Sequence, residues 1–157
     1  MTTEQELLSG LALTTFRLNG QLLDVAEQLA RPAGLTAARW QVLGAVLHEP
    51  LTVAAIARRM GLARQSVQRT ADLLVDSGLL ERLPNPAHRR ANLLQATASG
   101  LEAVGAITPQ HGAFAARLAD SVGPDALRRA LDNLEQLSWA LEALALEDVS
   151  RSASAAE

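Results

Sequence analysis

Residues 62–74, LARQSVQRTADLL, place two arginines and two glutamines on one side of a predicted helix. At about 100° per residue, the inward side of this helix would hold Val67, Thr70, Ala71 and Leu74. The outward side would hold Arg64, Gln65, Gln68, Arg69 and Asp72. Arginine can donate two hydrogen bonds to guanine O6 and N7, and glutamine can pair with N6 and N7 of adenine. The outward side therefore carries side chains suited to contacting base edges in the major groove of DNA.

An ordinary solvated helix face is the alternative interpretation of the same side chains. The distribution of charge favours contact with DNA. The chain of 157 residues has a formal net charge of -3, yet residues 58–90 hold seven arginines against three acids. Half of the 14 basic residues, all of them arginines, thus lie in about a fifth of the chain. One basic segment in an acidic protein is typical of a polyanion contact made by a single surface.

The residues before this helix have the pattern of a helix-turn-helix motif. Thr52 is predicted to cap a short helix that ends at Gly61. Ala57, Gly61 and Val67 follow one another at intervals of four and six residues. The motif needs a small residue where its helices cross, a glycine free to adopt positive φ in the turn, and a branched apolar residue that packs the second helix. This spacing predicts that residues 64–74 form the recognition helix.

A hairpin is predicted after the recognition helix, in residues 77–97. Two short apolar runs, Leu80–Leu83 and Asn92–Gln95, are the strand signal of the chain. The tip between them carries Arg89 and Arg90, which could reach an adjacent minor groove or its phosphates. A turn with two solvated arginines is the alternative. The predicted DNA-binding residues are Arg64, Gln65, Ser66, Gln68, Arg69, Arg89 and Arg90.

Helices are also predicted around this central segment. A long one ends before RPAG at residues 31–34, and a shorter one runs from Thr36 to about His48. Thr97 is predicted to cap another helix, which we expect to kink or restart at Pro109 and to end near Gly123. The last helix opens at Pro124, a residue favoured in a first turn.

The first and last helices carry long apolar stripes. In the first helix the positions alternate at intervals of four and three, at Leu11, Thr15, Leu18, Leu22, Val25 and Leu29. In the last helix leucine recurs at intervals of three and four, at Leu127, Leu131, Leu134, Leu137, Leu141 and Leu144. These stripes offer more apolar surface than a small core can cover, so we expect them to pair with a second copy of the chain. The alternative is that both helices cover the core of a monomer.

The composition argues against several other classes of protein. The chain has no cysteine, which excludes disulfides and thiolate metal sites. The three histidines form no ligand pair, so we expect no metal, no cofactor and no enzymatic site. The N-terminus lacks the basic region of a secretory signal, and no apolar run reaches the roughly 20 residues of a membrane span. We therefore expect a cytoplasmic protein, with a disordered tail at residues 149–157.

Taken together, these motifs resemble the MarR family of bacterial transcription regulators. The segment LTVAAIARRMGLARQSVQRTADLLVDSGLLER, the Pro- and Arg-containing hairpin and LLQATASGLEAV carry the resemblance, the last being similar to the LT..G start of the family's fifth helix. The resemblance implies a mainly α fold with a small β-hairpin wing. A winged helix-turn-helix lobe would cover about residues 36–97, and dimerisation helices about 4–30 and 98–146, within a single domain of residues 1–148.

The resemblance also implies how such a protein would work. A homodimer would bind a pseudo-palindromic operator as a repressor and release it when a small lipophilic or phenolic effector binds. Candidates for lining an effector cavity are Phe16, Trp40, His111, Phe114 and Trp139, for which plain core packing is the alternative. A winged-helix adaptor without DNA binding is the alternative function. Such an adaptor would keep the helix-turn-helix skeleton and lose the outward arginines and glutamines, whereas this chain keeps both.

Two positions depart from the family pattern. Where the family usually has an aspartate that anchors an arginine of the wing, this chain has His88. A neutral imidazole cannot anchor Arg90 as a carboxylate would, so we expect a more mobile wing or an affinity that depends more on pH. Where the family often has a serine or threonine cap on the recognition helix, this chain has Ala63. Loss of such a cap costs about 1 kcal/mol, which tertiary packing can offset.

Overall fold

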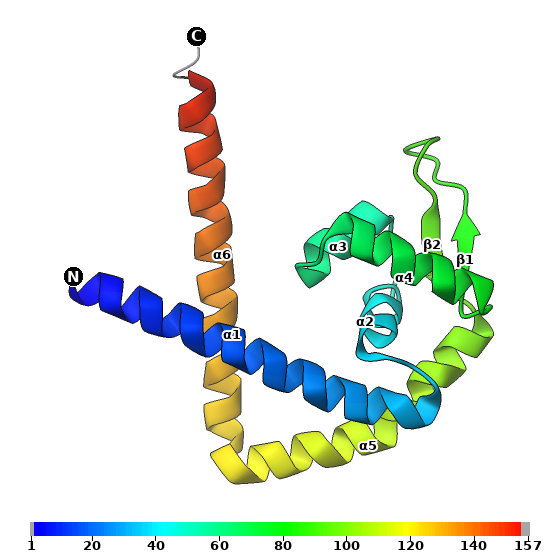
Figure 1. The fold of residues 1–157 in the computed structure, drawn as a ribbon, viewed down its shortest axis with the longest axis horizontal. Coiled ribbons are helices and arrows are strands. Elements are labelled where there is room, and N and C mark those ends of the chain that lie inside the picture. Colours follow the sequence, from blue (N-terminus) through cyan, green and yellow to red (C-terminus); the bar gives the residue numbers. More distant parts are fainter. Residues whose placement is uncertain (1, 155–157) are drawn as a thin grey trace. The chain divides into compact units, whose positions relative to one another are not determined.

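The protein is mainly helical, with one two-stranded antiparallel hairpin in a computed structural model that describes residues 2–154, residues 148–150 and 152–154 by their backbone only. In chain order the elements are α1 (Thr3–Ala30), a 3-10 turn (Arg31–Ala33), α2 (Ala37–Ala45), α3 (Val53–Met60), α4 (Arg64–Asp76), β1 (Leu80–Leu83), β2 (Leu93–Ala96), α5 (Ala98–Val122) and α6 (Pro124–Ser154) (Figure 1). This element order confirms the predicted fold class.

The chain divides into two compact units, Met1–His111 and Gly112–Glu157, with the boundary inside α5. The first unit contains α1 to α4, the hairpin and the first half of α5. Its core is apolar, and the largest fully buried side chains of the described residues are Leu43, Ile56, Leu74, Leu80, Ile107, Val42 and Val67. The predicted helix-turn-helix lobe, residues 36–97, lies wholly within this unit.

Threonines start two helices of the lobe, as the sequence predicts. The hydroxyl of Thr36 accepts a hydrogen bond from the Arg39 amide at 3.2 Å, and that of Thr52 accepts one from the Ala55 amide at 3.2 Å. The end of α2 was predicted at about His48 and lies at Ala45 instead. The last turn tightens to hydrogen bonds three residues apart and directs Val46, 3% exposed, into the core.

The turn between α3 and α4 has the predicted geometry. Gly61 adopts φ 63°, a conformation that residues with a Cβ avoid, and the amide of Leu62 bonds to the carbonyl of Ala57 at 2.9 Å. Ala57 and Val67 are 4% and 1% exposed, which confirms their place where the two helices pack. Ala63 makes no side-chain hydrogen bond at the start of α4. The helix-turn-helix therefore relies on packing rather than on a cap at this point.

The hairpin pairs Leu80 with Ala96 and Leu83 with Leu93. β1 has the predicted bounds, whereas β2 lies one residue later than predicted. The shift follows from burial, because Leu94 and Ala96 face the core and are 3% and 8% exposed. Leu94 also forms a bridge with Leu51, whose amide and carbonyl both bond to it. This bridge connects the hairpin to the chain just before α3.

A tight junction connects the hairpin to α5. The hydroxyl of Thr97 donates to the carbonyl of Gly78 at 2.6 Å and accepts from the amide of Gly100 at 3.1 Å, which confirms the predicted cap. Gly100 lies so close to β1 that a Cβ there would overlap the carbonyl oxygen of Leu79. The threonine and the glycine of the ATASG segment therefore have separate structural roles at one contact.

The helix α5 lies close to its predicted bounds, whereas α6 is longer than the sequence pattern indicated. α5 continues through Pro109, so of the two predicted possibilities, a kink or a restart, the restart is wrong. α6 begins at Pro124 as predicted and continues to Ser154, past residue 148, with an Arg151–Glu147 ion pair at 3.6 Å. Residues 155–157 of the predicted tail lie outside the described residues.

Between residues 2 and 154, no helix has both the length and the apolar character that a membrane span needs.

Candidate nucleic-acid interface

The orientation of α4 is fixed by its buried side. Val67, Ala71 and Leu74 are each no more than 1% exposed and pack into the core of the lobe. Full burial of a valine or leucine side chain contributes about 1.5–3 kcal/mol, so rotating the helix out of this position would be costly. The opposite side is solvent-exposed and carries Arg64, Gln65, Gln68 and Arg69. We refer to these four residues as the outward face of α4.

The outward face of α4 forms one wall of a groove of about 660 Å³. Its other walls are the start of α3 and the hairpin. The residues that line it are Thr52, Val53, Ala54, Arg64, Gln65, Gln68, Arg69, Asp72, Arg82, Arg90, Ala91, Asn92 and Leu94. All four residues of the outward face and Arg90 of the hairpin loop are thus brought together. Ser66 and Arg89 are exposed but do not line the groove.

The groove is basic. Four arginines and one aspartate line it. Within residues 2–154, Arg64, Arg69 and Arg90 have no hydrogen-bond or ion-pair partner, and neither has Arg89 just outside. A guanidinium group without a protein partner can donate two parallel hydrogen bonds to a phosphate or to a guanine edge. The groove therefore presents three free arginines and two glutamines to whatever enters it.

Asp72 and Arg82 also line this groove, although neither was among the predicted DNA-binding residues. Oδ1 of Asp72 accepts a hydrogen bond from Nε2 of Gln68 at 2.9 Å and another from Nη2 of Arg82 at 2.6 Å. The second contact connects α4 to β1. Strand alternation was the available signal, because it places Arg82 on the same side of β1 as the buried Leu80. On that side of β1, Arg82 stays 41% exposed and reaches Asp72 of α4.

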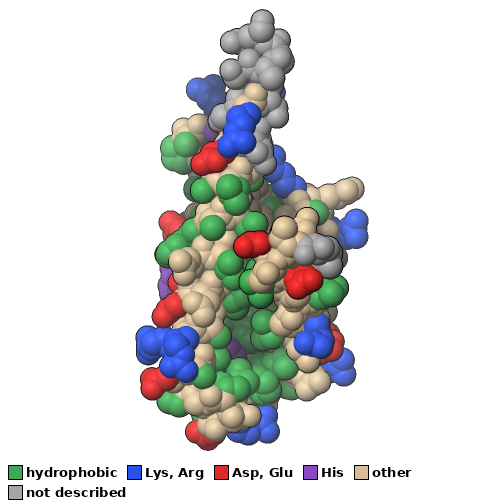
Figure 2. Space-filling model, turned by 90° about the vertical axis from the view of Figure 1, so that its left-hand side faces the viewer, with side chains coloured by type: hydrophobic (Ala, Val, Ile, Leu, Met, Phe, Trp, Pro, Cys, Tyr) green, Lys and Arg blue, Asp and Glu red, His purple; other side chains and the backbone are tan. Residues whose placement is uncertain are grey.

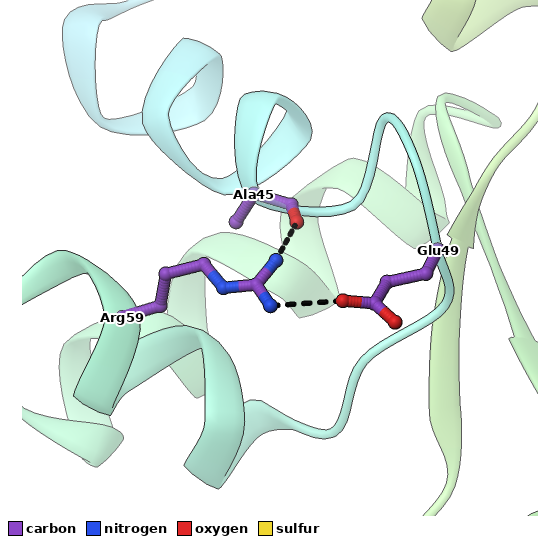
Figure 3. Close-up of polar contacts among 3 residues, drawn as sticks. All are labelled: Ala45, Glu49 and Arg59. Carbon is purple, nitrogen blue, oxygen red and sulfur yellow. Dashed lines mark hydrogen bonds and ion pairs between the residues drawn. The ribbon is translucent and has the colours of Figure 1, made fainter.

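Another arginine of the basic segment is used inside the lobe. Arg59 of α3 donates to the carbonyl of Ala45 at 3.3 Å and to the carboxylate of Glu49 at 2.8 Å (Figure 3). The two charged side chains are 50% and 57% exposed, so the ion pair contributes less than about 1 kcal/mol. Its effect is to hold α3 against the end of α2. Arg59 does not line the groove.

Comparisons with known proteins agree with this architecture. Residues 33–91 match a model of the MarR family. An uncharacterized protein of Mycobacterium tuberculosis is 42% identical over 136 residues, which cover 87% of this chain and 95% of the relative. The chain belongs to the MarR family.

Two solved structures illustrate the similarity of the fold. MosR of Mycobacterium tuberculosis, solved in complex with DNA, is 28% identical, with a TM-score of 0.66 and coverage of 83% of this chain and 96% of MosR. CouR of Rhodococcus jostii, solved with p-coumaroyl-CoA, is 22% identical, with a TM-score of 0.71 and coverage of 81% and 90%. The protein thus has the fold of the MarR-family transcriptional regulators.

The wing of this MarR-family member is held by its backbone. The amide of His88 bonds to the carbonyl of Asn85 at 3.2 Å, and the side chain of Asn85 accepts from the amide of Ala87 at 3.1 Å. These are turn contacts that need no charged partner. His88 itself is exposed. Its effect on wing mobility and on the pH dependence of affinity stays a prediction.

The aromatic candidates for an effector cavity lie in different surroundings. Trp40 meets His111 edge to face at 5.4 Å, and Arg117 lies over the ring of Phe114 at 5.6 Å. Phe16 and Trp139 are 72% and 67% exposed. None of the five candidates lines the groove or a smaller cavity of about 100 Å³ beside the end of α2.

In the part of the chain that the structure describes, no cluster of three or more His, Asp or Glu could hold a metal ion.

Proposed function

We propose that this protein is a sequence-specific DNA-binding transcriptional regulator. The observation that carries the proposal is the groove, in which Arg64, Gln65, Gln68 and Arg69 of α4 line the same cavity as Arg90 of the hairpin loop. In this proposal α4 enters the major groove and the hairpin contacts the adjacent minor groove or its phosphates. The complex of the related MosR with DNA supports it.

The residues of the interface would divide into two roles. Arginine and glutamine on the outward face of α4 would contact base edges and set the sequence preference. Arg89 and Arg90 on the hairpin loop would contact phosphates, which carry no sequence information. Ser66, exposed in the first turn of α4, would donate its hydroxyl to a phosphate or a base.

We propose further that the protein acts as a homodimer on a pseudo-palindromic operator. α1 exposes large apolar side chains, with Leu7, Leu13 and Phe16 at 69%, 69% and 72%. α6 does the same, with Leu131, Trp139 and Leu141 at 56%, 67% and 59%. Figure 2 shows such hydrophobic side chains on the helix that leads to the grey C-terminal residues. Exposed apolar side chains of this kind favour association with a second copy, whose symmetry a palindromic site would match.

The regulatory part of the proposal rests on membership of the MarR family. We propose that the protein is a repressor that leaves its operator when a small lipophilic or phenolic effector binds. The test is displacement of labelled operator DNA by a panel of phenolic acids and lipophilic compounds. A compound that displaces DNA should also raise the thermal unfolding temperature of the free protein, because it binds the folded state.

Selection from a random DNA pool tests the DNA-binding proposal. Repeated rounds of binding and amplification with the full chain should enrich one inverted-repeat motif, and DNA from upstream of its own gene should compete for binding. A matched selection with Arg64→Ala/Gln68→Ala should enrich a weaker motif or none. If the unmodified protein enriches no motif and forms no complex sensitive to salt, the winged-helix adaptor takes the place of this proposal.

A further inference from the structure

Asp72 is the only acidic side chain of the described residues that lines the groove. A carboxylate in a surface that binds phosphates weakens the attraction of that surface for DNA. Two groove residues, Gln68 and Arg82, donate hydrogen bonds to the same oxygen of Asp72, at 2.9 and 2.6 Å. The position of this carboxylate therefore affects one candidate base-contacting residue and one arginine at once.

The contact with Asp72 determines which way the amide of Gln68 points. An ionised carboxylate only accepts hydrogen bonds, so the amide nitrogen of Gln68 must face it and Oε1 must face away. Because the amide nitrogen has two hydrogens, one remains free beside Oε1. An acceptor next to a donor is the pair that N6 and N7 of adenine require. An amide without this contact could rotate by half a turn and offer hydrogens to the acceptors of guanine instead.

The contact with Asp72 pairs the positive charge of Arg82 within the protein, so this charge is not available to DNA. The ion pair joins side chains that are 41% and 47% exposed, so its contribution to folding is small. Its larger effect concerns DNA, since an arginine released into the groove would bind phosphates of any sequence. Arg64, Arg69 and Arg90 have no partner in the described chain, whereas the charge of Arg82 is paired with that of Asp72.

We propose that Asp72 is a positioning residue that determines the specificity of DNA recognition. It orients the amide of Gln68 for adenine, and it keeps Arg82 from phosphate contacts that are independent of sequence. This inference rests on the proposed function. Its test therefore compares variants on DNA to which the unmodified protein has been shown to bind.

The substitution Asp72→Asn removes the charge with little change of shape, and because an asparagine amide can turn either its oxygen or its nitrogen toward Gln68, it no longer fixes which way the Gln68 amide points. The probes are the duplex selected from a random pool, its single-base variants and a scrambled duplex of the same length. The variant Gln68→Ala identifies the base pair that Gln68 contacts, because the protein's base preference at that pair should disappear in this variant. At that pair, Asp72→Asn should lower the preference for adenine over guanine about tenfold. The affinity of the Asp72→Asn protein for the scrambled duplex should rise severalfold. The logarithm of this affinity should also fall more steeply with the logarithm of salt concentration, by the amount expected for about one additional phosphate contact.

Three further variants separate the causes. Asp76→Asn removes the same charge from the last turn of α4, where Asp76 is exposed and unpaired within residues 2–154, and should leave the base preference unchanged. Arg82→Gln keeps the contact between Asp72 and Gln68, so the adenine preference should persist without a gain on scrambled DNA. Gln68→Ala/Asp72→Asn should have the base preference of Gln68→Ala alone, because Asp72 acts through Gln68.

The outcomes distinguish this inference from the proposed function. An Asp72→Asn protein that keeps its adenine preference overturns the inference, and so does one whose affinity for scrambled DNA does not rise. Loss of the adenine preference in Arg82→Gln overturns the inference as well. This second test does not require that the Asp72→Asn protein fold. An unmodified protein that distinguishes no sequence would overturn the proposed function and the inference together.

Discussion

At the scale of single residues, the arginines of the basic segment differ in what holds them. Arg59 and Arg82 are paired with carboxylates of the lobe, at 2.8 and 2.6 Å. Arg64 and Arg69 on α4 have no partner in the described chain and line the groove. A paired arginine shapes the protein, whereas a free one is available to a ligand. The positive charge available to DNA is thus smaller than the composition of residues 58–90 indicates.

This division predicts two kinds of effect on DNA affinity. Arg64→Ala or Gln68→Ala should weaken operator binding by about 1–3 kcal/mol and relax the base preference. Arg89→Ala or Arg90→Ala should weaken all sequences more evenly and reduce the salt slope by about one. Fluorescence anisotropy on operator and random duplexes measures both, with Arg31→Ala, which lies outside the groove, as the control. Equal losses on both duplexes for all four variants would show that the reading surface lies elsewhere.

At the scale of elements, the lobe depends on contacts between neighbours that no single helix can make. Val67 and Leu74 fix the rotation of α4, and Gly100 lets the start of α5 approach the carbonyl of Leu79. Because the hairpin lies between α4 and α5 in the chain, this approach also fixes where β1 begins.

The approach of α5 to β1 gives a prediction about stability. Gly100→Ala should lower the free energy of unfolding by about 1–3 kcal/mol, because the added methyl group would overlap a backbone carbonyl that cannot move aside. Gly44→Ala is the matched control in the same lobe, since nothing lies within 4 Å of the added atom. It should be neutral or stabilising by up to about 1 kcal/mol. Urea unfolding measures both; similar effects in the two variants would contradict the account of this junction.

Local signals explain which elements the sequence could predict. Gly61 and the threonine caps act within a few residues, so the short helix, the turn and α4 were predicted correctly. The start of β2 was missed by one residue because its register depends on burial of Leu94, a tertiary contact. The contact of Asp72 with Arg82 was missed for the same reason, since it joins a helix to a strand across ten residues. Five of the seven predicted interface residues line one groove.

At the scale of the whole molecule, the terminal helices carry apolar surface that their own units leave exposed. On α6 the leucines of the predicted stripe are 37% exposed or more, among them Leu131 and Leu134. The basic groove, by contrast, lies in the first unit, on a chain whose net charge is -3. An acidic protein with one basic surface would bind DNA in a defined orientation. A dimer would present two such surfaces.

The exposed stripe of α6 predicts the effect of charge on assembly. Leu131→Glu/Leu134→Glu should convert the protein from dimer to monomer, because it places two carboxylates in an apolar contact. Gln136→Glu, on an exposed position of the same helix, should leave the dimer intact. Sedimentation velocity measures the result, and removal of residues 124–146 should likewise leave monomers. A truncated protein that still sediments as a dimer would place the contact elsewhere.

Recognition of a particular DNA sequence by the groove between α4 and the hairpin can be measured as a ratio of affinities. The affinity of the unmodified protein for its selected duplex is compared with that for a scrambled duplex of equal length, at one near-physiological salt concentration. We expect a ratio of about a thousand or more, since specific binding exceeds nonspecific binding by that factor in proteins that contact base edges. A ratio near one, with both complexes lost together as salt is raised, would contradict sequence recognition by this groove.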